Sequence, residues 1–226
     1  MFFPIGDDQI KGGAYPIFSY CFLIVNILVF LYQSSLDPNQ LSAFYESFST
    51  IPSYIVDGHH YGTLVSSMFL HGSVMHLIGN MLFLWVFADN IEATIGNLAF
   101  VCFYLAGGVL ASLAHVYFNI DSDVPSLGAS GAISAILGAY LIMFPKSKVN
   151  VLIFLIIILK RVTMSAFAFL GIWIALQIFN TYQSFGVDQG GGTAWFAHIG
   201  GLAFGLAMGL VFKKDAQRYT SQSVVA

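Results

Sequence analysis

The sequence predicts an all-α fold, a polytopic membrane bundle of six transmembrane helices with both termini on the cytoplasmic side. Three observations support this class. The 226 residues are 58% hydrophobic and only 8% charged, whereas about a quarter of an average soluble domain is charged. Long apolar stretches recur along the chain, and the basic residues cluster between particular pairs of them. A soluble or disordered chain needs far more charge to cover its surface.

Six stretches approach the length of about 20 apolar residues that a spanning helix needs. They cover residues 14–32, 71–88, 98–118, 130–145, 163–182 and 194–212. The region from 149 to 182 is too long for one span, and Lys160 and Arg161 interrupt it, so 149–159 is predicted to be a short submerged or interfacial piece. Residues 1–13 then form a short cytoplasmic N-terminus, and 213–226 form a cytoplasmic tail.

The basic residues predict the orientation, because Lys and Arg favour the cytoplasmic side of a membrane. With six spans and an inside N-terminus, every basic residue falls inside: Lys11, Lys146, Lys148, Lys160, Arg161, Lys213, Lys214 and Arg218. The outer loops, about 33–70, 119–129 and 183–193, contain no Lys or Arg. The first stretch lacks a small-residue cleavage site, so it is predicted to be an anchor and not a removed signal. The net charge of −3 disfavours a nucleic-acid partner, because phosphates need a basic surface.

Polar residues at membrane depth are costly and are therefore functional candidates. Ser130 lies at the start of the fourth span and His198 lies near the start of the sixth. Both spans run inward from the outer face, and at 1.5 Å per residue both side chains fall about 6 Å deep. Taken alone, each has a plain structural explanation, as a small packing residue or an interhelical hydrogen bond. Together they form a serine with an adjacent base, the arrangement that activates a hydroxyl nucleophile.

An attacked carbonyl also needs donors for its developing negative charge. The backbone N–H of Ser130 is free at a helix start. His76 and Asn80 are four residues apart, so they share one face of the second span at a similar depth. His71 and His76 are about 140° apart around that helix, which is poor geometry for sharing one metal ion. No metal or other cofactor is therefore expected, and His115 is taken as structural.

These residues resemble the rhomboid intramembrane serine proteases, over nearly the whole chain. The resemblance rests on three motifs, in order, on alternate spans: His71-Gly72-Ser73-Val74-Met75-His76 followed by Asn80, then Gly128-Ala129-Ser130-Gly131, then Ala197-His198-Ile199-Gly200-Gly201. It implies a Ser130–His198 dyad without an acidic third member, and an oxyanion site made by His76, Asn80 and the Ser130 backbone. It implies structural roles near the site for His71, Gly128, Gly131 and Gly201.

The sequence departs from the family pattern at two places. Gly62 and Thr63 stand where many relatives carry a Trp-Arg pair, which puts the anchoring of the outer loop in question. Ser134 stands where many relatives carry an aromatic ring that stacks on the catalytic His. The packing that orients His198 must then come from elsewhere or be looser. In the family, an acidic residue in the turn matching Asp89–Glu92 ties loops together. The fifth span carries Trp173 and Gln177. By resemblance to the family alone, its packing on the second span is expected to act as a lateral gate for substrates.

The resulting functional hypothesis is an intramembrane endopeptidase that cuts membrane-protein substrates near the outer face, in a bacterial plasma (inner) membrane. The alternative is a catalytically silent relative that binds membrane clients. An intramembrane metalloprotease needs a His-Glu-x-x-His helix, and an aspartyl protease needs two buried Asp; the sequence has neither. A transporter usually shows internal repeats and a midplane site, whereas the polar residues here lie toward one face.

Overall fold

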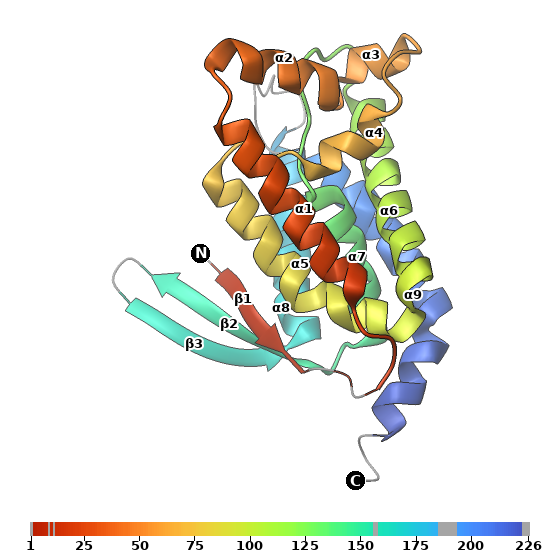
Figure 1. The fold of residues 1–226 in the computed structure, drawn as a ribbon. Helices are drawn as coiled ribbons and strands as arrows, with labels where there is room; N and C mark the ends of the chain where they lie inside the picture. The colour runs from red at the N-terminus through yellow and green to blue at the C-terminus, as the bar shows by residue number, and fades with distance from the viewer. Residues whose placement is uncertain (1, 9, 11, 156–157, 185–193, 223–226) are drawn as a thin grey trace.

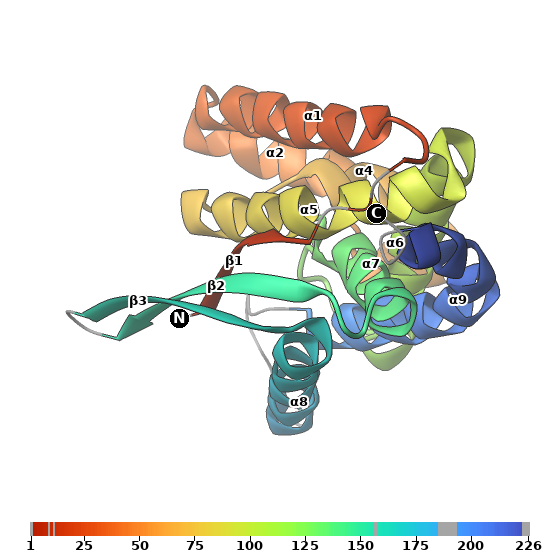
Figure 2. The ribbon, with the colours of Figure 1, turned by 90° about the horizontal axis from the view of Figure 1, so that it is seen from below.

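The computed structural model describes residues 2–8, 10, 12–155, 158–184 and 194–222. Its long helices run side by side as a bundle, and a small sheet extends from one end (Figure 1). Seen from below, the strands project to one side of the helices (Figure 2). The helices are α1 (Ile17–Ser34), α2 (Pro38–Phe48), α3 (Pro52–Val56), α4 (Thr63–Ser66), α5 (Val74–Ile95), α6 (Asn97–Phe118), α7 (Ser130–Met143), α8 (Ala166–Ser184) and α9 (Trp195–Gln222), with a 3-10 turn η1 (Ser67–Phe69). The strands are β1 (Phe2–Asp7), β2 (Lys148–Leu155) and β3 (Ile158–Ser165).

Four of the helices in the described part of the chain, α1, α5, α6 and α9, are long and apolar enough to cross a membrane. The helix α7 is apolar but shorter, with 14 residues, or about 21 Å. The predicted helical membrane bundle is therefore confirmed as a class, while the count of six spans remains a prediction. The observed helices begin and end within a few residues of the predicted stretches, except that α5 and α9 continue further at their inner ends.

The short helix α7 lies inside the bundle, and every residue from Gly131 to Tyr140 is buried. An apolar helix with no polar face belongs in such a position. Its neighbour α9 approaches it closely, because a Cβ at Gly138 would lie only 2.6 Å from the carbonyl oxygen of Leu202. Protein surrounds α7, so its short length leaves no backbone group exposed to lipid.

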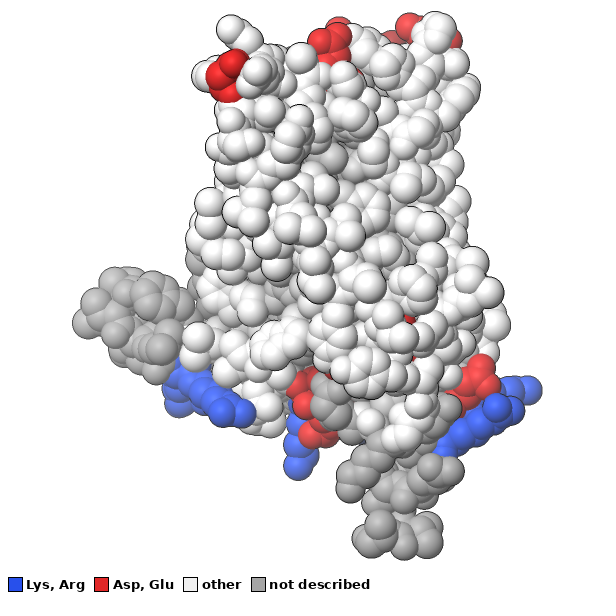
Figure 3. Space-filling model, in the orientation of Figure 1, with Lys and Arg blue, Asp and Glu red and all other residues white. Residues whose placement is uncertain are grey.

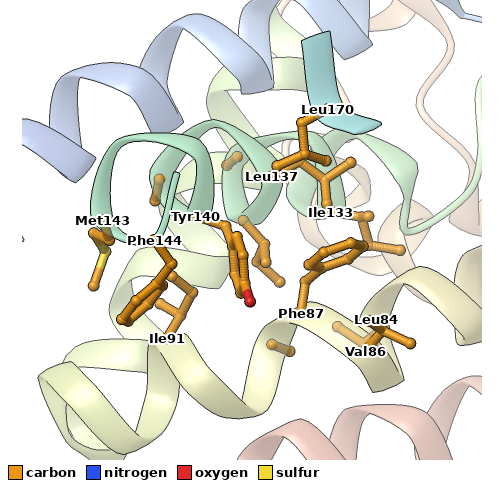
Figure 4. Packing of buried hydrophobic residues seen from close by; sticks show 14 of the residues in the cluster. Leu84, Val86, Phe87, Ile91, Ile133, Leu137, Tyr140, Met143, Phe144 and Leu170 are labelled. Carbon is orange, nitrogen blue, oxygen red and sulfur yellow. The ribbon is translucent and has the colours of Figure 1, made fainter. Parts of the chain in front are cut away.

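The centre of the core is an aromatic and aliphatic cluster between α5 and α7, shown in Figure 4. The rings of Phe87 and Tyr140 meet edge to face with centroids 4.9 Å apart, a preferred geometry for aromatic pairs. Ile91 and Leu137 pack in the same cluster and are no more than 1% exposed. This packing fixes α7 against α5 below the level of Ser130.

The end of the bundle that is predicted to face outward is built from the 33–73 segment, which folds into α2, α3, α4 and η1 above the long helices (Figure 1). The helix α2 is started by Asp37, whose carboxylate accepts hydrogen bonds from the backbone N–H groups of Asn39 and Gln40. A second connection joins this segment to the loop before α7: Thr50 and Ser126 exchange backbone hydrogen bonds of 3.0 and 2.8 Å. That pairing satisfies irregular backbone near the site, as burial requires.

The region predicted as a submerged or interfacial piece over 149–159 is instead part of a β-hairpin, with β2 and β3 paired antiparallel. The strand β1 adds to β2, which gives the sheet order β1-β2-β3. Val149 and Val151 are fully buried on one face of β2, while Lys148 and Asn150 alternate with them on the other. Strand alternation explains this amphipathic pattern, which the apolar run 151–159 conceals in the sequence. The sheet also moves the start of the fifth helix from 163 to Ala166, and it orders part of the predicted N-terminal tail.

The described basic residues lie at the sheet end of the molecule. On the face shown in Figure 3, Lys and Arg occur only at the end that carries the sheet and the C-terminal part of α9, whereas the α2–α4 end carries only acidic charge. Lys11 and residues 185–193 of the third predicted outer loop lie outside the described residues. The separation agrees with the predicted charge partition between two sides.

Candidate active site

Ser130 and His198 are brought together as a hydrogen-bonded pair. Ser130 is the first residue of α7 and His198 lies in the first turn of α9. The Oγ of Ser130 lies 2.8 Å from the Nε2 of His198, which is a good hydrogen-bond distance. His198 is buried, with 8% of its surface exposed, while Ser130 is partly exposed. The geometry places a basic ring nitrogen beside a hydroxyl that is still reachable from outside the core.

Small residues allow this approach of α7 and α9. A Cβ on Gly201 would clash with the carbonyl oxygen of Gly131, and a Cβ on Gly131 would lie 2.7 Å from the Cβ of Ala111 on α6. Both glycines lie next to the Ser–His pair in the sequence. Small residues at such contacts let helix backbones come together, so Gly131 and Gly201 lie where α7 closely approaches α6 and α9. The structural roles that the resemblance implies for them stay predictions.

The predicted oxyanion residues of α5 converge on the loop just before Ser130. A Cβ on Gly128 would lie 2.8 Å from Nε2 of His76 and 3.6 Å from Nδ2 of Asn80. Gly128 also has a φ of +127°, which side-chain-bearing residues rarely adopt. Gly128 is therefore required twice, for its backbone conformation and for the space that His76 and Asn80 fill.

His71 supports this group from behind. Its ring is completely buried, and its Nε2 lies 2.8 Å from the Nδ2 of Asn80. Its backbone is held by Gln33 of α1, through bonds of 3.1 and 3.2 Å. The residue thus orients the Asn80 amide, in keeping with the structural role that the resemblance implies. Within the described residues, no three His, Cys, Asp or Glu side chains gather as a metal site would require.

The imidazole of His198 is also in contact with two tryptophans and a glutamine. The ring of Trp195 meets the imidazole edge to face at 5.6 Å, and that of Trp173 lies 6.3 Å away. The Nδ1 of His198 lies 2.7 Å from the Oε1 of Gln177. Ser134, at the position where many relatives carry the stacking aromatic, donates its hydroxyl to the carbonyl oxygen of Ser130 at 2.7 Å. The described ring contacts of His198 therefore come from Trp173 and Trp195.

The second departure, at Gly62 and Thr63, is also compensated by hydrogen bonds. Thr63 is buried, and its hydroxyl donates to the carbonyl oxygen of His60 at 2.7 Å. The hydroxyl of Thr50 donates in turn to the carbonyl oxygen of Thr63 at 2.9 Å. The 33–73 segment is thus anchored by hydrogen bonds from threonine hydroxyls to backbone carbonyls where many relatives carry the Trp-Arg pair.

The contacts of two buried residues, Gln177 and Glu92, were not predicted from the sequence. Gln177 is a buried amide on α8, and its signal was a polar side chain between apolar neighbours, Leu176 and Ile178. Glu92 is fully buried, and its carboxylate accepts from the backbone N–H groups of Phe18 and Ser19 at 2.9 and 2.7 Å. Its signal was only the resemblance, which implied loop contacts, whereas the structure shows it bound to the start of α1.

A helical membrane bundle that holds a partly exposed serine in a hydrogen bond to a buried histidine defines the class of the protein. The chain matches the family model described as Rhomboid domain over residues 58–215, which is well over half of its length. The chain belongs to the rhomboid family.

Individual relatives agree with that assignment. The chain is 33% identical over 148 residues to Presenilin-associated rhomboid-like protein A, mitochondrial, of Danio rerio, an alignment covering 63% of this chain and 35% of the relative. It is 25% identical over 169 residues to Rhomboid protein 1, mitochondrial, of Saccharomyces cerevisiae, covering 73% and 45%. It is 32% identical over 126 residues to Rhomboid protease GluP of Bacillus subtilis, covering 56% and 24%. The chain spans less than half the length of these relatives.

Proposed function

We propose that this chain is an intramembrane serine endopeptidase that cleaves transmembrane segments of other membrane proteins near the outer face. The observation that carries the proposal is the 2.8 Å contact between Ser130 Oγ and His198 Nε2. The rhomboid family includes intramembrane serine proteases, and the relative from Bacillus subtilis is named as a protease. Membrane-protein substrates follow from that family membership.

The proposed reaction begins with proton transfer from the Ser130 hydroxyl to Nε2 of His198 as Oγ attacks the scissile carbonyl carbon. The resulting oxyanion is expected to meet the Ser130 backbone N–H, which lies at the positive end of α7, and the side chains of His76 and Asn80. The protonated His198 then gives its proton to the leaving amine, which leaves an acyl ester on Ser130. Water, deprotonated by His198, hydrolyses that ester and restores the serine.

The substrate segment must unwind before it can react, because the carbonyls of a helix are already hydrogen-bonded. Glycine lowers the cost of unwinding because its helix propensity is poor, and serine does so to a smaller degree. We therefore propose that substrates carry small or helix-destabilising residues around the scissile bond.

The test is cleavage of a single-span reporter by purified protein in liposomes. Ser130→Ala and His198→Ala should each lower the rate by at least about 10³-fold, as in other serine hydrolases. Ser47→Ala and His59→Ala, at exposed outer positions, should leave the rate unchanged. Equal cleavage by Ser130→Ala would refute the nucleophile. If the wild type retains reporters without cutting them and a fluorophosphonate does not label Ser130, the protein is the client-binding alternative.

The compartment is a separate part of the proposal. We propose a plasma membrane with the sheet end in the cytoplasm, which places the described basic residues inside. The two mitochondrial relatives make the mitochondrial inner membrane the alternative. Fractionation of the native cell, with the protein detected by antibody, distinguishes the two membranes.

A further inference from the structure

We infer that Gln177 is a positioning residue for the His198 base, a neutral third member of the site beside Ser130 and His198. This inference rests on the proposed function. The Oε1 of Gln177 lies 2.7 Å from the Nδ1 of His198, on the side of the ring opposite Ser130. The three side chains form one chain of hydrogen bonds, since His198 Nε2 lies 2.8 Å from Ser130 Oγ.

The two ring nitrogens need opposite roles if His198 is to act as a base. Its Nε2 must be unprotonated to receive the serine proton, so the single proton of the neutral ring must lie on Nδ1. An oxygen acceptor at Nδ1 favours that tautomer and also fixes the rotation of the ring. In serine hydrolases with an aspartate in this position, the carboxylate has the same orienting task.

A neutral hydrogen-bond acceptor is better suited than a carboxylate to a position beside the buried ring of His198. Burying a carboxylate away from water is costly unless it is well paired, and the carboxylates of α5, Asp89 and Glu92, lie at the opposite end of that helix from His76 and Asn80. A glutamine amide supplies the same acceptor oxygen without a charge. Among the described residues, the hydrogen-bond partners of the His198 ring are Gln177 and Ser130, and neither is acidic. Gln177 therefore explains how the pair is oriented by a neutral group.

The neighbours of Gln177 on α8 show that its burial is specific. Leu176, Ile178 and Phe179 are 45, 57 and 58% exposed, whereas Gln177 is 7% exposed. The apolar residues thus point outward, and the one polar side chain in this stretch turns inward to the histidine. An amide facing lipid would lose its hydrogen bonds, so the bond to His198 also holds this part of α8 in place.

The tryptophans offer a competing explanation, in which Trp173 and Trp195 orient the ring and Gln177 only fills space. Three variants separate these explanations in the wild-type background. Gln177→Leu removes the acceptor at similar volume, Gln177→Glu keeps an acceptor oxygen and adds charge, and Gln183→Leu is a matched control at an exposed glutamine on the same helix. Far-ultraviolet circular dichroism and gel filtration establish that each variant is folded.

The kinetic readout is reporter cleavage in liposomes as a function of pH. Gln177→Leu should lower kcat by about 10- to 100-fold, a part of what general base catalysis contributes, with little change in KM. Gln177→Glu should recover most of that loss and move the acid limb of the profile to higher pH, because a carboxylate stabilises the imidazolium. His76 and His115 are the titratable groups whose charge acts on His198, and they are the same in all variants. Gln183→Leu should match the wild type.

Two kinetic results overturn the inference. One is a kcat for Gln177→Leu within about twofold of the wild type. The other is an equal loss in the Leu and Glu variants with an unshifted acid limb, which indicates packing alone.

A second measurement does not depend on activity. Nitrogen-15 spectra of histidine-labelled protein, with His198 assigned by its absence in His198→Ala, should show a proton on Nδ1 in the wild type and a mixture of tautomers in Gln177→Leu. An unchanged tautomer in Gln177→Leu overturns the inference even if the enzyme is active. If the wild type neither cleaves reporters nor reacts with a fluorophosphonate, the proposed function fails, while the spectra still decide whether Gln177 orients His198.

Discussion

Individual glycines set the distance between α7, which carries Ser130, and α9, which carries His198. At Gly138 of α7, an added Cβ would lie 2.6 Å from the carbonyl oxygen of Leu202 and 2.8 Å from the backbone nitrogen of Leu206. Both atoms belong to the backbone of α9, so neither can rotate away as a side chain would. The position of His198 relative to Ser130 thus depends on atoms about one to two helical turns further along α7 and α9.

Gly138→Ala is therefore expected to lower the free energy of unfolding by about 1–3 kcal/mol, the usual cost of overpacking, and to slow cleavage. Denaturant titration in mixed micelles and reporter cleavage provide the measurements. Gly171→Ala is the matched control, since nothing lies within 4 Å of the Cβ it would add on α8. Equal stability of the two variants would show that α7 and α9 can separate without cost.

At the scale of elements, α1 is started by a residue from another helix. Its N-cap, Pro16, makes no side-chain hydrogen bond, and the fully buried carboxylate of Glu92 on α5 takes its place. Glu92 accepts from the N–H groups of Phe18 and Ser19 and from the Ser19 hydroxyl, the last at 2.6 Å. The positive end of the α1 dipole compensates the buried charge.

Glu92→Gln should lower the free energy of unfolding by about 2–4 kcal/mol, because its amide group presents N–H donors to the N–H donors of α1. The measurement is denaturant titration in mixed micelles, together with limited proteolysis at the start of α1. Glu46→Gln is the control at an exposed carboxylate of α2, where a change within about 0.5 kcal/mol is expected. A Glu92→Gln protein as stable as this control would contradict the capping role.

At the scale of the whole molecule, charge separates the two ends of the bundle. The strands β2 and β3 carry Lys148, Lys160 and Arg161, whereas Asp57 follows α3 and Asp121 lies in the loop after α6, at the other end. Such a division corresponds to the two sides of a membrane. It also provides a direct way to test the predicted six spans and the orientation.

Single cysteines placed in a background lacking Cys21 and Cys102 should report the sides. An impermeant maleimide should label Asp57→Cys and Asp121→Cys on intact cells, but label Lys160→Cys and Lys214→Cys only after permeabilisation. All four positions are exposed in the structure, so labelling after permeabilisation provides the positive control. Labelling of Lys160→Cys on intact cells would refute the six-span, cytoplasmic-terminus arrangement.

The sequence predicted the arrangement best at the candidate site, where polar residues lie next to glycines in the sequence. Ser130, His198, His76 and Asn80 were all expected near one another, because depth and helix spacing depend only on rise per residue, and the structure brings them to one region. Gly131 and Gly201 were expected at close helix contacts for the same reason. Their catalytic roles remain predictions.

The sequence was least informative where position depends on distant partners. The continuous apolar run 151–159 has no period that separates a strand from a buried helix, and only pairing with β1 and burial of Val149 and Val151 reveal the sheet. Gln177 acquires its partner from the next helix, α9, and Glu92 acquires its partners from α1, more than 70 residues away in the sequence. No local pattern could have indicated those contacts.

The short length of α7 has a consequence for which peptide bond of a proposed substrate reaches Ser130. The helix has 14 residues, whereas α1, α5, α6 and α9 have between 18 and 28, so Ser130 lies at a depth set by the protein and not by the surrounding lipid. In a bilayer with longer acyl chains, a substrate helix sits differently along the membrane normal while Ser130 keeps its place in the bundle. The peptide bond presented to Ser130 then shifts along the substrate sequence, and lipid thickness becomes a determinant of where the product ends.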